Sequence, residues 1–95
     1  MLIIAGSLRV APEDRDEYVA SMENLIRETR VKPGCLDFIL AADPIDPGRV
    51  NLFEQWESEE HLVAHQASAN VPETVTEILG DEVRKYQIES VGPVF

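Results

Sequence analysis

Residues 52–68 read LFEQWESEEHLVAHQAS, and the spacing of the apolar side chains changes in this stretch at Ser58. Before Ser58, apolar and polar residues alternate, which is typical of a half-buried β-strand. After it, a serine followed by two glutamates favours a helix through about residue 68, because serine caps free N–H groups and acids match the helix dipole. Two residues are unusual for elements that build a core. Glu54 falls on the apolar side of the strand, and His65 falls on the helical stripe of Leu62.

The rest of the chain divides into strands and helices by the same criteria. Alternation predicts strands at residues 2–10, 35–43, 49–56 and 82–95, and helical spacing predicts a helix from residue 11 to residue 32. Pro33 and Gly34 end that helix, and the sequence PIDPG at residues 44–48 predicts a hairpin turn. Residues 71–80, VPETVTEILG, are predicted to form a second short helical piece.

The order strand, helix, strand, strand, helix, strand predicts an α+β fold. Two split βαβ halves of this kind give the ferredoxin-like plait (βαββαβ), a four-stranded antiparallel sheet with both helices on one face. Ninety-five residues suffice for one domain, so residues 1–95 are expected to form a single ferredoxin-like domain.

Strand alternation assigns residues to the two faces of this sheet. The helix-covered face is expected to carry Glu54 together with an apolar set: Leu2, Ile4, Leu8, Leu36, Phe38, Leu40, Leu52, Trp56, Tyr86 and Ile88. The other face is expected to carry Ile3, Ala5, Cys35, Ile39, Phe53, Val83 and Val91. Because this second face is too apolar for water, we expect a homodimer that closes sheet against sheet.

Charge and cysteine content exclude several partners. The 18 acidic and 8 basic residues give a net charge of −10, the wrong sign for nucleic acid or an anionic membrane. The single cysteine, Cys35, fits a reducing compartment. Residues 1–10 have no basic leader, and their apolar run ends at a charged residue, Arg9. They are therefore interpreted as a strand, not as a signal peptide or membrane span. A cytoplasmic location is therefore expected.

Glu54, Trp56 and His65 form the candidate site. A carboxylate on an apolar face must be paired, protonated or beside water, because burying it alone is too costly. Each residue also has an ordinary structural interpretation: Glu54 pairing with a cation at the rim, Trp56 as core, and His65 as a satisfied half-buried side chain. Taken together they favour a small-molecule pocket, which typically combines aromatic walls with a few converging polar groups.

The segments PGCLDFIL, FEQW and SEEHLVAHQAS resemble the antibiotic biosynthesis monooxygenase family. The resemblance rests on Pro33, Gly34 and Cys35 at the entry to the second strand, on Glu54 and Trp56 in the third, and on a histidine nine residues after the tryptophan, His65. It covers essentially the whole chain and implies a dimeric α+β barrel of ferredoxin-like protomers.

The resemblance also implies an activity: oxidation of a quinol or polycyclic phenol by O2, with no flavin, haem or metal. The protein would then supply a proton acceptor, an aromatic wall and hydrogen bonds to an oxyanion. His65 is the first candidate for proton transfer, and Glu54 either orients it or is itself the base. Trp56 completes the expected catalytic set, with its N–H available to a quinol oxygen. The expected substrate-binding residues are Phe38, Tyr86, Asn51 and Leu52.

Some positions depart from branches of this family. The haem-degrading branch has an asparagine where Ser7 stands, a tryptophan near the position of His65 and a haem-ligating histidine near Val75, so haem degradation is not expected. Many relatives carry a second histidine near Asn70.

Competing interpretations remain open at this point. His61 and His65, with Glu57 nearby, have a spacing that can hold a metal ion, but a solvated His61 is the better interpretation. Cys35 is interpreted as a structural thiol. In place of an enzyme, the chain could be a non-catalytic aromatic-ligand-binding or stress-related dimer, or an assembly partner of a larger oxidase.

Overall fold

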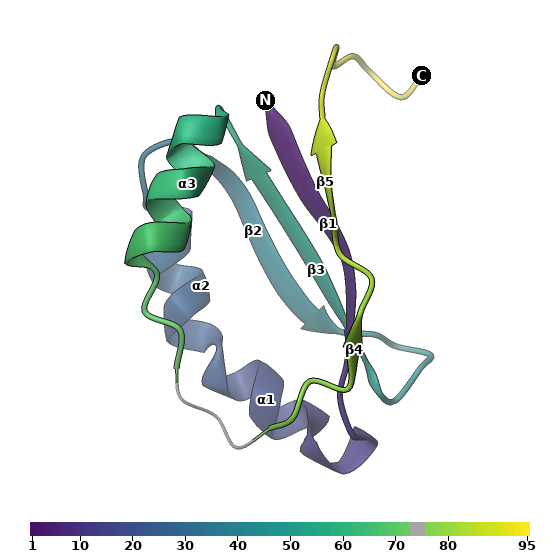
Figure 1. The fold of residues 1–95 in the computed structure, drawn as a ribbon. Helices are drawn as coiled ribbons and strands as arrows, with labels where there is room; N and C mark the ends of the chain where they lie inside the picture. Colours follow the sequence, from purple (N-terminus) through teal and green to yellow (C-terminus); the bar gives the residue numbers. More distant parts are fainter. Residues whose placement is uncertain (73–75) are drawn as a thin grey trace.

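The computed structural model describes residues 1–72 and 76–95, which form one antiparallel sheet and a layer of helices (Figure 1). The strands are β1 (Leu2–Arg9), β2 (Cys35–Ala42), β3 (Arg49–Trp56), β4 (Gly80–Asp81) and β5 (Arg84–Gln87). The helical elements are the 3-10 turn η1 (Pro12–Asp14), α1 (Arg15–Ser21), α2 (Glu23–Arg30) and α3 (Glu59–Ser68). The strand order is β2-β3-β1-β4, and β5 also pairs with β1.

This arrangement confirms the predicted α+β, ferredoxin-like fold. The helices lie on one side of the sheet, and β1 lies between β3 on one edge and the C-terminal strands β4 and β5 on the other (Figure 1). Under the helices lie two core clusters. The larger contains Val10, Tyr18, Met22, Leu25, Leu40 and Val50, and the smaller contains Leu2, Trp56 and Leu62. The candidate site adjoins the smaller cluster.

The predicted first helix forms, but in three pieces. It begins with η1, whose first residue is a proline, and α1 and α2 meet at Met22. Tyr18, Met22, Leu25 and Thr29 recur at helical spacing and are all buried. Thr29 is accommodated because its hydroxyl donates a 2.6 Å hydrogen bond to the carbonyl oxygen of Leu25.

A β-bulge at the start of β2 exchanges the predicted faces of Cys35 and Leu36. Cys35 pairs with Trp56 and Asp37 pairs with Gln55, so Leu36 is an extra residue in the ladder. Cys35 therefore packs under the helices, whereas Leu36 is 46% exposed. The predicted faces of these two residues are wrong because alternation fails across a bulge. It resumes at Phe38.

The short helix predicted over residues 71–80 does not form in its described part. Residues 73–75 lie outside the described residues, as does Val75, which entered the comparison with the haem-degrading branch. Residues 71–72 and 76–79 are non-helical, and Gly80 begins β4. The N–H of Leu79 donates to the carbonyl oxygen of Arg9 at 2.8 Å, so the backbone here runs along β1.

The last strand is interrupted, which moves Tyr86 to the face opposite the one predicted. β4 and β5 are separated at Glu82 and Val83, and this backbone passes so close to Gly6 that a Cβ at Gly6 would collide with it. In the resulting register Tyr86 pairs with Ile3 and is half exposed on the open face. The residues of β5 that face the helices are Lys85 and Gln87, both bonded to Glu59.

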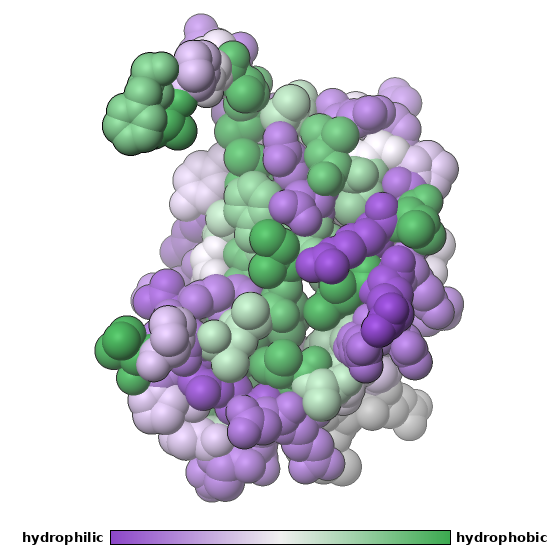
Figure 2. Space-filling model, turned by 180° about the vertical axis from the view of Figure 1, so that it is seen from behind, coloured by the Kyte–Doolittle hydropathy of each residue, from purple (hydrophilic) through white to green (hydrophobic). Residues whose placement is uncertain are grey.

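The open face of the sheet is apolar along its middle. It carries Ile3, Ala5, Ile39, Ala41, Phe53 and Tyr86, of which Ile39 and Tyr86 are exposed. From behind, the molecule shows hydrophobic side chains gathered in a band along its length (Figure 2). A surface of this kind favours association.

The helices of the described residues are all too short or too polar to cross a membrane.

The turn that leads into β2 is packed against α3. Gly34 has a φ of 80°, a left-handed conformation that favours glycine. A Cβ at this position would collide with the imidazole of His61, which caps the turn from the first turn of α3. The carbonyl oxygen of Gly34 also accepts a 2.8 Å hydrogen bond from the N–H of Glu57. The Pro-Gly pair therefore fixes how closely α3 approaches the sheet.

We expect Gly34→Ala to lower the free energy of unfolding by at least about 1 kcal/mol, because a positive φ is unfavourable for alanine and its Cβ would also collide with His61. Urea denaturation measures this. In the double variant Gly34→Ala/His61→Ala the collision is absent, so its loss should be smaller than the sum of the single losses. Gly80→Ala, where an added Cβ meets open space, is the control. Equal losses for Gly34→Ala and Gly80→Ala would contradict this account.

Candidate functional site

The site lies where the C-terminal end of β3 meets the start of β2 beneath α3. The register aligns Trp56 with Leu2, and it aligns Glu54 with Ile4 and Phe38, all on the helix-covered face. Trp56 is fully buried, and Glu54 and Phe38 are buried beside it. Strand alternation therefore places a carboxylate inside the apolar layer, as the sequence predicts.

The carboxylate of Glu54 is satisfied by the tryptophan. The indole Nε1–H of Trp56 donates a buried 3.1 Å hydrogen bond to Oε1 of Glu54. The two residues are separated by one position on β3, so both side chains leave the strand on the same side. The indole N–H is thereby already used and is not free for a quinol oxygen, contrary to the expectation from the sequence.

Burial raises the pKa of Glu54, and the indole hydrogen bond opposes part of that rise. Burial disfavours the charged carboxylate, whereas a donor aimed at it favours the charge. Among the ion pairs of the described residues, none involves Glu54. The Glu54 carboxyl group is therefore buried, holds its proton to higher pH than usual, and has a neutral hydrogen-bond partner.

His65 projects from α3 onto the tryptophan. The imidazole stacks on the indole of Trp56 with ring centroids 4.8 Å apart and an interplanar angle of 29°. Phe38 meets the same imidazole edge-on at 5.9 Å. Two aromatic neighbours thus hold the ring, and His65 is buried.

Lys32 contacts the exposed edge of this imidazole. Its Nζ lies 3.0 Å from Nδ1 of His65 and 3.4 Å from the hydroxyl oxygen of Ser68. Burial lowers the pKa of His65, and the positive charge of Lys32 lowers it further. Because an ammonium can only donate, Nδ1 is the acceptor, and the neutral ring carries its proton on Nε2.

A cavity of about 160 Å³ opens beside these side chains. Its lining residues are Lys32, Pro33, Trp56, His61, Ala64, His65 and Ser68. The floor is apolar and aromatic, and the polar atoms come from one lysine, two histidines and a serine. Ala64 and Ser68 are exposed, so the cavity reaches the surface of α3.

The structure brings together part of the predicted site. Trp56 and His65 line the cavity, Glu54 lies behind the indole, and Phe38 braces the imidazole. Leu52 instead packs against the larger core cluster.

Two predicted residues lie on the opposite face. Asn51 pairs with Ser7 and Ala41 on the open side, where its side-chain amide donates a 2.9 Å hydrogen bond to Asp43. Tyr86 lies on that side too, at Ile3. Neither contributes to the cavity beside Trp56.

Lys32 and His61 were not expected at this site. The sequence suggests that His61 is solvated, and Lys32 lies at the end of the predicted first helix, away from the candidate residues in the sequence. In the structure His61 is half-buried, with its Nδ1 2.7 Å from the hydroxyl oxygen of Ser58. The Pro-Gly turn is the sequence feature that could have placed both residues at the site. It directly follows Lys32 and leads into β2, whose residue Cys35 pairs with Trp56.

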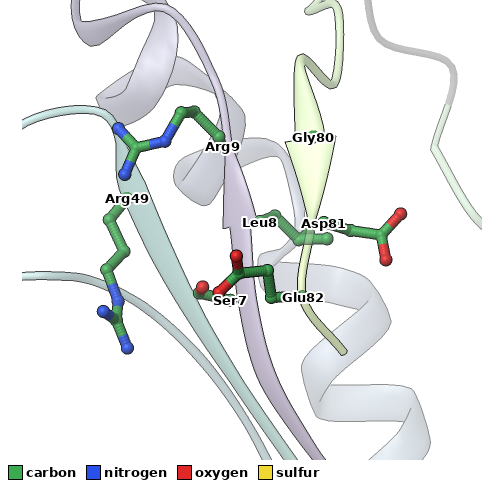
Figure 3. A pocket seen from close by; sticks show the side chains of 7 residues that line it. All are labelled: Ser7, Leu8, Arg9, Arg49, Gly80, Asp81 and Glu82. Atoms are coloured by element: carbon green, nitrogen blue, oxygen red, sulfur yellow. The ribbon is translucent and has the colours of Figure 1, made fainter. Parts of the chain in front are cut away.

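A second cleft, of about 220 Å³, lies at the other end of β1 (Figure 3). Its lining residues are Ser7, Leu8, Arg9, Arg49, Gly80, Asp81 and Glu82. Both arginines have acidic partners nearby, since Arg9 is bonded to Asp46 and Arg49 lies 3.9 Å from Asp43. With its cations already paired and no aromatic wall, this cleft is a weaker candidate than the cavity beside Trp56.

Within the described part of the chain, no cluster of three or more His, Cys, Asp or Glu residues is placed to hold a metal ion. Burial raises the pKa of the Cys35 thiol, with Asp37 and Glu54 adding to the effect, which is the behaviour of an unreactive thiol.

The sequence pattern of the family described as antibiotic biosynthesis monooxygenase matches residues 1–77 of this chain. The uncharacterized protein sll1783 of Synechocystis is 27% identical over 64 residues, which make up 67% of this chain and 44% of that protein. The chain thus spans less than half the length of this relative.

Solved structures share the fold. A candidate antibiotic biosynthesis monooxygenase from Deinococcus radiodurans superposes with a TM-score of 0.83 at 19% identity, over 100% of this chain and 99% of that one. The heme-degrader MhuD of Mycobacterium tuberculosis, solved with two hemes in its active site, superposes with a TM-score of 0.71 at 16% identity, over 97% and 100% of the two chains.

The raised pKa of Glu54 predicts a pH-dependent effect of Glu54→Gln, which keeps an acceptor for the indole but cannot ionise. A carboxyl whose pKa is higher when folded stabilises the fold below its ordinary value of 4.5 and loses that contribution as pH rises through the folded pKa. We therefore expect Glu54→Gln to gain stability relative to the parent protein as pH rises from 4.5 towards neutral.

Urea denaturation between acid and neutral pH measures this difference. Glu28→Gln, the same change at an exposed position of α2, is the matched control. A stability difference for Glu54→Gln that does not change with pH would show that the Glu54 carboxyl is not destabilised by burial.

Proposed function

The chain belongs to the antibiotic biosynthesis monooxygenase family, and on that basis we propose that it is an oxidoreductase that oxidises a quinol or phenol with O2 without a bound cofactor. The observation that carries the proposal is the stack of His65 on Trp56 at the wall of a cavity, with Lys32 at the imidazole edge. The arrangement combines a flat aromatic surface, a neutral proton acceptor and a fixed positive charge.

The reaction balances without an added reductant. A quinol supplies four electrons to O2, so that one oxygen atom enters the ring as a new hydroxyl group and the other leaves as water, while the quinol becomes a hydroxyquinone. The first requirement is removal of a phenolic proton, because the phenolate is the electron-rich species that reduces O2. A group that accepts this proton near neutral pH is therefore the main contribution of the protein.

We assign proton transfer to His65. Its lowered pKa keeps the imidazole neutral, and Nδ1 carries the lone pair that now accepts from Lys32. A phenol that enters between the two groups would give its proton to Nδ1 and leave its oxygen beside the ammonium, which stabilises the anion. Glu54 is assigned a positioning role, because its hydrogen bond fixes the indole on which the imidazole stacks.

The volume of the cavity limits the size of the substrate. At about 160 Å³ it is smaller than the ~300–1,000 Å³ of typical ligand pockets, which favours a small quinol over a polycyclic phenol.

One observation favours an alternative, a non-catalytic module that binds an aromatic ligand. Both candidate bases already have partners, Glu54 at the indole and His65 at Lys32. A protein that only holds a ring would need no free proton acceptor. A reducing, cytoplasmic location fits either function and rests on Cys35.

Oxygen uptake by the purified protein with small quinols tests the enzymatic proposal. We expect uptake above the rate seen with heat-denatured protein, because these compounds also oxidise unaided. His65→Gln should lower kcat by at least about 100-fold, the usual contribution of a general base. Trp56→Phe, which removes the indole N–H, should lower it as well. Glu28→Gln, on the exposed face of α2, should leave it unchanged.

Circular dichroism must show that each variant folds, because Trp56 is fully buried. Saturable binding of a quinol without oxygen uptake would reject the enzyme and support the binding module. Uptake that survives His65→Gln would move proton transfer to another group.

We also propose that the protein is a homodimer closed through the open face of the sheet. The support is the apolar strip on that face, which includes exposed Ile39 and Tyr86. Light scattering should give twice the chain mass of 10.6 kDa, and Ile39→Lys should return it to the monomer value. Ile45→Lys, at an 89% exposed position in the β2–β3 turn, is the matched control. A monomeric mass for the parent protein at micromolar concentration would rule the dimer out.

A further inference from the structure

Lys32 presents a positive charge to the cavity and has no negative partner among the described residues. Its contacts are the neutral imidazole of His65 at 3.0 Å and the hydroxyl of Ser68 at 3.4 Å. The ion pairs of the described residues join Arg9, Arg27, Arg49 and Lys85 to acids, and none of them includes Lys32. Lys32 is half-buried, so water screens this charge less than it would on an open surface.

The surroundings of Lys32 are unusual for this chain. The protein carries 18 acidic residues against 8 basic ones, yet none of the described residues that line the cavity is acidic. The nearby buried acid, Glu54, lies behind the indole and is bonded to it. Among the described residues the cavity is therefore a cationic site within an acidic protein, and a lysine whose described neighbours are neutral gains most from an anionic ligand.

The shape of the cavity restricts that ligand to a single ring. The volume of about 160 Å³ is below that of common drug-sized pockets, and the wall consists of the stacked rings of Trp56 and His65. A ring can lie against this wall while a substituent reaches Nζ of Lys32. Ser68 and His61 offer further hydrogen-bonding groups at the rim.

We propose that the cavity selects a single-ring phenol or quinol that bears a carboxylate, and that Lys32 is the residue that recognises the carboxylate. The carboxylate and an adjacent phenolic oxygen share the Lys32 ammonium, and the ring lies against Trp56 and His65. The inference rests on the proposed function only in taking the bound ring to be a phenol. It adds that the substrate is anionic before any proton is removed, and that Lys32 determines specificity.

The tryptophan gives a direct readout of binding. Trp56 is the single tryptophan of the chain and lines the cavity, so ligand entry should change its fluorescence. The probes are 2,5-dihydroxybenzoate and 2,5-dihydroxybenzamide, which share the ring and hydroxyl groups and differ in the charge of one substituent. Titration without oxygen, at constant ionic strength and with correction for ligand absorbance, prevents any turnover.

We expect saturable binding of the carboxylate with a dissociation constant at least tenfold lower than that of the amide. Lys32→Met should reduce this preference to less than twofold. Arg27→Met removes the same charge from an exposed position of α2 and should keep the preference. Circular dichroism shows whether both variants keep the parent fold, and Lys32→Arg, which keeps the charge, should keep most of the preference.

Equal affinities for the carboxylate and the amide, or no saturable binding of the carboxylate at millimolar concentration, would overturn the inference. So would a preference that survives Lys32→Met. These results are independent of the proposed activity. Absence of oxygen uptake leaves the anaerobic binding result standing, and oxygen uptake with uncharged quinols alone would reject the carboxylate while keeping the enzyme.

Discussion

A fully buried indole organises the region that we assign to function. Trp56 brings a large apolar surface to the cluster with Leu2 and Leu62, but its N–H also needs an acceptor once water is excluded. Glu54 is that acceptor, and it occupies an apolar face only because the indole is there. His65 stacks on a face of the same indole. The burial of one side chain thus accounts for an acid within the core layer and for a histidine where leucine would be ordinary.

The parts of this arrangement that follow from strict periodicity could be predicted from the sequence. Alternation along β3 places Glu54 and Trp56 on the same side, and helical spacing from Ser58 turns His65 toward them. The hairpin of β2 and β3 adds Phe38 opposite Glu54. Each step uses a regular element without insertions, so a residue number alone fixes the direction of the side chain.

The remaining differences arise where the regular pattern is interrupted. The bulge at Leu36 and the break between β4 and β5 each shift the alternation, and neither leaves a clear mark in composition. Tyr86 consequently lies on the open face. Lys32 reaches the cavity through a tertiary contact with α3 across a turn, and local periodicity cannot reveal such a contact. Its charge changes the chemistry of the site, because it adds to the effect of burial in lowering the pKa of His65.

The two edges of β1 are completed by different parts of the chain, which has a consequence for folding. β3 pairs with one edge, and β4 and β5, which lie much further along the sequence, pair with the other. A chain in which β3 has joined β1 but β4 and β5 have not presents free backbone groups beside an apolar face, a state open to wrong pairing with neighbouring chains. The pairing of Gly80–Gln87 therefore protects the sheet from edge-to-edge association as well as completing it.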